Sequence, residues 1–136
     1  MLKLTKKVEY ALISLVHISE QEDGQLLSAK QISVANSIPL EVLAKTLQHL
    51  ASLNIIKSVK GPKGGYQLNK DIGDINIIDF IEKLEGPIGL IDCTTSVKCD
   101  RECNCTIKEP MIDINNRVIN ILKSITLDKF TKLSEE

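Results

Sequence analysis

The sequence predicts a mainly α-helical protein with a small β-hairpin wing, that is, a winged helix-turn-helix followed by a long C-terminal helix. Three observations predict this fold class. Apolar residues recur at helical spacing in several segments of the chain. Residues 28–50 contain the signals of two short helices joined by a tight turn. Two short extended segments follow directly, separated by the glycine-rich loop GPKGG.

The first two helices are indicated by an apolar stripe and by a capping sequence. An amphipathic helix is expected from about residue 5, with turn residues at 23–25 ending that region. Its stripe consists of Leu4, Val8, Ala11, Leu12, Leu15 and Ile18. Ser28 and Gln31 have the form of a capping box at the start of a second, short helix. Asn36 is expected to end that helix.

The third helix and the hairpin complete the predicted unit. Pro39 is expected in the first turn of the helix, where its missing N–H costs nothing. The buried face is expected to hold Val42, Leu43, Leu47 and Leu50. Segments 55–60 and 66–69 are expected to pair as a hairpin with Lys63 at its tip. This order is typical of a winged helix, and an ordinary helical domain with an incidental hairpin is the alternative.

Two further helices are expected after the hairpin. Asp74 is the expected cap of the first, and Gly86 lies past its end. Pro110 is expected to open a long helix whose apolar stripe is Ile114, Val118, Ile121, Leu122 and Ile125. The twin helix of a second subunit would cover this stripe, or the chain's own domain would. We therefore divide the chain into a winged helix-turn-helix domain (1–86), a cysteine-rich loop (87–109) and a long helix with its tail (110–136).

Composition and charge exclude some classes of protein. No apolar run approaches the roughly 18 residues of a membrane span, and the N-terminal stretch lacks a signal-peptide core. We therefore expect a cytoplasmic protein without membrane contact. Residues 1–70 carry nine basic and five acidic side chains, whereas residues 71–136 carry eight basic and thirteen acidic ones. A polyanion would therefore bind the basic first half of the chain. His17 and His49 lie in separate helices without a nucleophile motif, and no enzyme is expected.

The four cysteines lie within thirteen residues, at Cys93, Cys99, Cys103 and Cys105. Structural zinc sites usually use two C-x2–4-C pairs, and only one such pair is present here. Iron–sulfur clusters accept looser spacing and a non-cysteine ligand. Neighbouring basic residues would instead favour a reactive thiolate. The residues favour a metal or cluster site over a thiol switch, and a zinc-stapled loop is the third option.

The chain resembles the Rrf-two family of bacterial transcription regulators over nearly its whole length. The resemblance rests on LTKKVEYAL, SAKQISVANSIPLEVLAKTLQHL, VKGPKGGYQL and LEGPIGLIDC, together with the C-x5-C-x5-C spacing of Cys93, Cys99 and Cys105. The last stretch is most similar to the branch that regulates the Suf assembly operon. The resemblance implies a homodimer, joined through the long C-terminal helix, that binds double-stranded DNA at a pseudo-palindromic operator. Repression is the family expectation.

The resemblance also implies a cofactor. Cys93, Cys99 and Cys105 would bind one 2Fe–2S or 4Fe–4S iron–sulfur cluster per subunit. The cluster would control the affinity of the protein for DNA at the operators of cluster-assembly or stress genes. The histidine that is the fourth ligand in one branch is replaced by Lys108, which has no lone pair when protonated. Another branch uses an acidic residue of the partner's first helix, where this chain has Glu9. Cys103 is the alternative fourth ligand, and Glu9 would then be a solvated helix residue. A nitric-oxide-sensing repressor and a cluster-free thiol regulator are the alternative functions.

The expected DNA-binding residues lie in the helix-turn-helix and in the hairpin. They are Ser28, Pro39, Leu40, Glu41, Ala44, Lys45, Gln48, Lys60, Lys63, Gly64 and Gly65. Lys45 would meet guanine or phosphate, and Gln48 would meet adenine. Lys60 and Lys63 would reach the adjacent minor groove or its phosphates. Lys3, Lys6 and Lys7 would add contacts to the DNA backbone.

Overall fold

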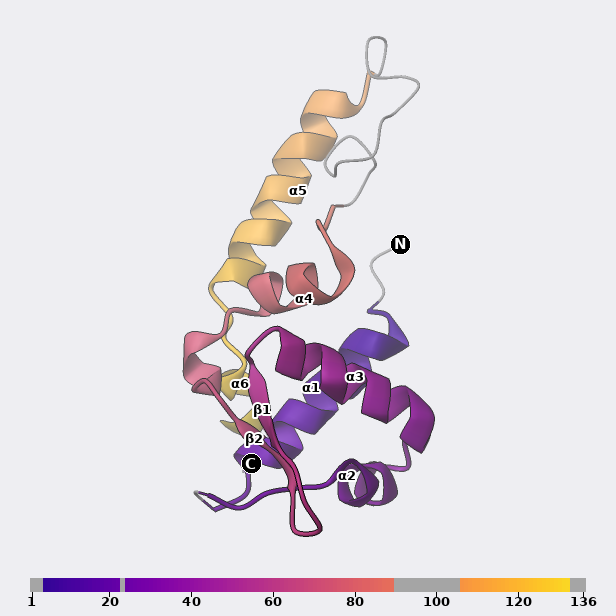
Figure 1. Ribbon diagram of the computed structural model, residues 1–136. Helices are drawn as coiled ribbons and strands as arrows, with labels where there is room; N and C mark the ends of the chain where they lie inside the picture. Colours follow the sequence, from indigo (N-terminus) through magenta and orange to yellow (C-terminus); the bar gives the residue numbers. More distant parts are fainter. Residues whose placement is uncertain (1–3, 23, 90–105, 133–136) are drawn as a thin grey trace.

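The computed structural model describes residues 4–22, 24–89 and 106–132 of the 136-residue chain (Figure 1). Five helices and one hairpin in these ranges were predicted, whereas a short 3₁₀ turn and a C-terminal helix were not. The elements are α1 (Lys6–Ser19), α2 (Ala29–Asn36), α3 (Leu40–Ser52), β1 (Ile56–Val59), β2 (Gly65–Leu68), the 3₁₀ turn η1 (Ile72–Asp74), α4 (Ile77–Glu85), α5 (Lys108–Lys123) and α6 (Asp128–Lys132). Strands β1 and β2 pair antiparallel, with Ile56 opposite Leu68 and Val59 opposite Gly65. The mainly helical winged fold is therefore confirmed.

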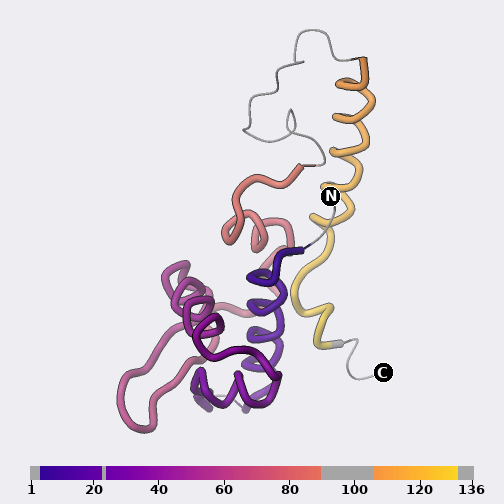
Figure 2. Tube along the Cα trace, turned by 90° about the vertical axis from the view of Figure 1, so that its right-hand side faces the viewer, coloured from indigo at the N-terminus to yellow at the C-terminus, as the bar shows by residue number. Residues whose placement is uncertain are grey.

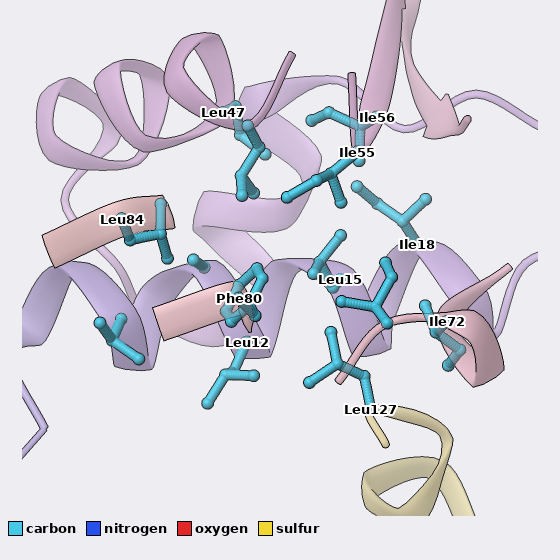
Figure 3. Close-up of a cluster of buried hydrophobic side chains, with 14 of the residues drawn as sticks. Leu12, Leu15, Ile18, Leu47, Ile55, Ile56, Ile72, Phe80, Leu84 and Leu127 are labelled. Atoms are coloured by element: carbon cyan, nitrogen blue, oxygen red, sulfur yellow. The ribbon is translucent and has the colours of Figure 1, made fainter. Parts of the chain in front are cut away.

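Helix α1 lies at the centre of the hydrophobic core. Its apolar stripe is buried from Val8 to Ile18, whereas Leu4, which precedes the helix, is 40% exposed. Figure 3 shows Leu12 and Leu15 beside Phe80 of α4, and Ile18 on the side of Ile55 and Ile56. Phe80 and Leu47 are fully buried. Complete burial of one such side chain contributes about 1.5–3 kcal/mol, so this hydrophobic cluster is the main source of stability.

Both ends of α2 lie where the sequence predicted them. The Ser28 hydroxyl accepts a hydrogen bond from the Gln31 amide at 3.1 Å, and the Gln31 side chain accepts one from the Ser28 amide at 2.8 Å. These two bonds confirm the capping box. Asn36 is the last residue of α2, also as predicted, and Ser37 follows in the left-handed conformation with φ 54°.

Three details of the later helices differ from prediction. Asn76, and not Asp74, caps α4, because its side chain accepts the Ile78 amide at 2.9 Å while Asp74 is used in η1. Helix α5 begins two residues before Pro110, which lies in the first turn, where helix amides have no intrahelical partner. Pro39 immediately precedes α3 as its cap residue.

The C-terminal part of α5 and the segment after it return to the winged unit. The Ile77 amide donates to the Ile125 carbonyl and the Leu127 amide donates to the Ile75 carbonyl, both at 3.0 Å. Leu127 is 2% exposed and belongs to the core, as Figure 3 shows. The N-terminal part of α5 extends away from the unit, at the end of the molecule opposite the hairpin tip (Figures 1 and 2). The three-segment division remains a prediction.

Candidate DNA-binding surface

The turn between α2 and α3 is held by backbone and side-chain bonds. Ser37 adopts the left-handed conformation, and the Ile38 amide then donates to the Ser33 carbonyl at 3.1 Å. The Ser33 hydroxyl donates to the Ile38 carbonyl at 2.5 Å. Ile38 itself is 4% exposed and packs in the core. The angle between the two helices is therefore fixed by contacts on both sides of the turn.

Helix α3 divides into an inner and an outer face. Leu43, Leu47 and Leu50 are fully buried. The predicted DNA-binding residues Pro39, Leu40, Glu41, Lys45 and Gln48 are all exposed, and Ala44 is half-buried. The structure thus brings these residues together on one surface. Ser28 lies apart from them at the start of α2, where its hydroxyl is engaged as the helix cap.

Val42 was assigned to the wrong face of α3. Its side chain is 44% exposed, and Thr46 is buried instead, donating its hydroxyl hydrogen bond to the Val42 carbonyl at 3.0 Å. The buried face therefore has the spacing 43, 46, 47, 50, which an apolar-only pattern misses. An exposed valine beside Glu41 and Lys45 therefore adds an apolar group to this surface.

The lysines of α1 differ in their surroundings. Lys7 lines a hollow of about 420 Å³ together with Glu41, Val42, Lys45, Thr46 and His49 of α3. Its ammonium group donates to the Leu84 carbonyl at 3.1 Å. Lys6 is exposed and lies 2.9 Å from the Glu9 carboxylate, and this hydrogen bond raises the pKa of Lys6 above its ordinary value. Lys3 lies outside the described residues.

The wing tip is a tight loop that exposes two lysines. Lys60 and Lys63 are exposed on either side of Pro62. The Gly64 amide donates to the Gly61 carbonyl at 2.9 Å, and Gly61 has φ 120°. A Cβ atom at Gly64 would lie 2.0 Å from the Val59 carbonyl oxygen, so only glycine fits there. The loop therefore positions the lysines through its glycines.

Of the predicted cofactor ligands, only Glu9 lies among the described residues. Cys93, Cys99, Cys103 and Cys105 lie outside the described residues. Glu9 is half-exposed on α1 and lines a groove of about 640 Å³. The other residues lining this groove are Leu12, Ile13, Val16, His17, Glu20, Ala35, Asn36 and Phe130. Lys108, at the position where the resemblance predicted a histidine ligand in one branch, begins α5.

A helix-turn-helix whose second helix exposes polar side chains, followed by a lysine-tipped hairpin, defines a winged-helix DNA-binding protein. The sequence profile of the Rrf2 family, described as an iron-dependent transcriptional regulator, matches residues 4–132. The chain therefore belongs to the Rrf2 family, and the resemblance noted in the sequence is confirmed.

Individual relatives agree with this assignment. The transcriptional regulator NsrR of Bacillus subtilis is 28% identical over 137 aligned positions, which cover 99% of this chain and 94% of NsrR. Among solved structures, CymR, described as the global cysteine regulator of B. subtilis, superposes with a TM-score of 0.81 at 26% identity and covers 98% of both chains. IscR of T. potens gives a TM-score of 0.75 at 26% identity, covering 98% of this chain and 88% of its own. The chain is thus similar to transcription regulators throughout its length.

No helix in the described ranges is long and apolar enough to cross a membrane.

Proposed function

We propose that this protein is a homodimeric transcriptional repressor of the cytoplasm that reads a pseudo-palindromic operator and whose DNA affinity is controlled by an iron–sulfur cluster. The observation that supports DNA binding is the surface formed by the outer face of α3 and the wing lysines. Lys45 and Gln48 would contact base edges in the major groove, with Lys60 and Lys63 on the flanking backbone or minor groove. Most of the affinity would come from phosphate contacts.

The dimer is proposed from the exposed part of the predicted α5 stripe, since Leu122 and Ile125 of that stripe pack against the protein's own core. Ile107, Ile114 and Ile121 are 55%, 47% and 64% exposed. Ile107 directly precedes α5, and Ile114 and Ile121 follow it at intervals of seven residues, which is the spacing of one position of a coiled-coil heptad. A second copy of the same helix would cover these exposed side chains. Two DNA-binding units related by a two-fold axis match a pseudo-palindromic operator.

The control element is proposed to be the cysteine loop. Three thiolates, from Cys93, Cys99 and Cys105, with one carboxylate oxygen form a chemically acceptable ligand set for one 2Fe–2S or 4Fe–4S cluster per subunit. Glu9 is a candidate fourth ligand because its carboxylate is half-exposed on α1, and Cys103 is the alternative. The iron-dependent description of the family supports this proposal, as does the similarity to NsrR and IscR.

Glu9 would also connect the cluster to DNA binding. A ligand from the first helix of one subunit to the cysteine loop of the other would tie the cluster state to the relative placement of the two DNA-binding units. Loss of the cluster would release that link and shift the population toward a different DNA affinity. A nitric-oxide-sensing repressor is a variant of this proposal, since nitric oxide displaces weak cluster ligands.

A cluster-free thiol regulator is the second candidate, and a specific observation favours it. The B. subtilis structure with a TM-score of 0.81 to this chain is that of a cysteine regulator, CymR. Four cysteines within thirteen residues would also allow a disulfide to form and be reduced.

The experiment that separates these candidates is an anaerobic UV–visible spectrum with iron and sulfide analysis. Wild type, Cys93→Ala and Glu9→Ala would be compared, and DNA binding would be measured on the same samples. Charge-transfer bands with matched iron and sulfide, lost in Cys93→Ala, support the cluster sensor. A retained cluster and an unchanged DNA response in Glu9→Ala would remove the role of Glu9. Colourless protein with free thiols after anaerobic reconstitution would support the thiol regulator, and stoichiometric zinc would support a zinc-stapled one.

A further inference from the structure

The second strand of the wing is hydrogen-bonded on both of its edges. On one edge Tyr66 lies opposite Ser58 of β1. On the other edge the Leu27 amide donates to the Tyr66 carbonyl at 3.1 Å, and the Tyr66 amide donates to the Leu27 carbonyl at 2.7 Å. Leu27 thus forms an isolated β-bridge with the outer edge of the hairpin. The next residue, Ser28, is the cap of α2, so two backbone hydrogen bonds connect the wing to the start of the helix-turn-helix.

Gly65 allows this connection to form. A Cβ atom at Gly65 would lie 2.7 Å from both the carbonyl carbon and the carbonyl oxygen of Leu27, and 3.1 Å from the Ser28 nitrogen. These are backbone atoms, so no side-chain rotation relieves the contact. Gly65 is not among the glycines with positive φ, so its role is to leave space and not to permit an unusual backbone conformation.

We propose that Gly65 is a positioning residue for DNA binding, because its missing side chain lets Leu27 pair with Tyr66 and so fixes the wing relative to α2 and α3. The sequence alone placed Gly65 among the residues that contact DNA. Here it acts on DNA only through Lys60 and Lys63, whose distance from the α3 surface depends on the direction of the hairpin. This inference rests on the proposed DNA-binding function.

The test is the salt dependence of DNA binding by full-length Gly65→Ala. The probe is a labelled duplex from the region upstream of the protein's own gene, titrated at several salt concentrations. Each phosphate contact contributes about 0.9 to the slope of log K against log salt, which is about an eightfold change in affinity for a tenfold change in salt concentration. Although Gly65→Ala removes no charge, we expect its slope to fall by about one to two units, as in Lys60→Gln/Lys63→Gln. Adding Gly65→Ala to that double variant should then have little further effect.

Gly73→Ala is the matched control. Gly73 is also not among the positive-φ glycines, and a Cβ atom there would meet the Asp71 side chain at 3.2 Å, in a segment that is not part of the wing. Gly73→Ala should keep the wild-type slope. An unchanged affinity in Gly65→Ala overturns the inference. The inference is also overturned if Gly65→Ala lowers the affinity without changing the salt slope, and if this loss adds fully to that of the lysine substitutions. Lower stability alone would produce that result.

Amide hydrogen exchange of the wild type covers the case in which Gly65→Ala does not fold. The amides of Leu27 and Tyr66 should be protected to the same degree as those of α3, whereas exchange as fast as that of the wing loop would overturn the inference. Wild-type protein that does not bind this duplex even at low salt, where phosphate contacts alone give non-specific binding, would overturn the proposed function as well. Wild-type binding with an unaffected Gly65→Ala variant overturns the inference alone.

Discussion

The exposed edge of α5 provides a quantitative test of the proposed dimer. Ile114 and Ile121 lie two helical turns apart on this edge and are 47% and 64% exposed. We consider the double variant Ile114→Ser/Ile121→Ser, which removes both apolar side chains without adding charge. If a second copy covers this edge, the variant should dimerise much more weakly than the wild type.

The size of the effect follows from the exposed fractions. Complete burial of an isoleucine side chain contributes about 1.5–3 kcal/mol, so covering the exposed part contributes roughly 1.0–1.9 kcal/mol at Ile121 and roughly 0.7–1.4 kcal/mol at Ile114. Each side chain is buried twice in a symmetric dimer. The double variant should therefore lose about 3.4–6.6 kcal/mol, which raises the dimer dissociation constant at least about 300-fold.

Sedimentation equilibrium of the two proteins measures this constant directly. Val34→Ser is the matched control, because Val34 is 72% exposed on α2 and lies outside the α5 edge. The control should keep the wild-type constant, and urea unfolding should show that all variants are folded. A double variant that dimerises as tightly as the wild type would refute the assignment of this edge to the interface.

Three further predictions concern the helix ends and the wing. Ser37→Gly should stabilise the protein by about 0.5–1 kcal/mol in urea unfolding, because a residue at φ 54° is strained unless it is glycine, and lower stability would contradict this. Lys63→Gln should lower the salt slope of DNA binding by about one unit, whereas an unchanged slope would exclude a phosphate contact at the wing tip. Asn76→Ala should cost about 1–2 kcal/mol, because Asn76 caps α4 and its amide donates to the Lys123 carbonyl. Asn76→Asp should recover only the cap, and wild-type stability in Asn76→Ala would show that neither bond contributes.

The elements that could be predicted are those with local signals. Ser28 and Gln31 sit three residues apart and satisfy each other's amides, so the start of α2 follows from the sequence alone. The hairpin follows from the glycines of its loop. The cap of α4 could not be chosen correctly, because polar residues at 71, 74 and 76 all had suitable chemistry. Packing decided the choice, since Ile72 and Ile75 are buried and the intervening turn uses Asp74.

The candidate site shows the same division between local and non-local information. The exposure of Lys45 and Gln48 on α3 agrees with the helical periodicity, but Val42 was misplaced because a buried threonine completes the inner face. The pairing of Leu27 with Tyr66 joins segments far apart in the chain, and no local pattern indicates it. The contacts with DNA and the cysteine ligand set depend on a second molecule or on residues 90–105, so they remain predictions.

The position of Leu127 has a consequence for the order of events during synthesis. This residue follows α5 in the chain, yet it is 2% exposed within the core of the DNA-binding unit, beside Leu15 and Ile72 in Figure 3. A ribosome that has released only the first hundred residues holds a chain whose core still lacks one of its members. Since domains generally fold as units once their residues are available, the winged unit should reach full stability only after α5 has emerged. A nascent chain that ends before Leu127 should therefore be less stable than the complete chain.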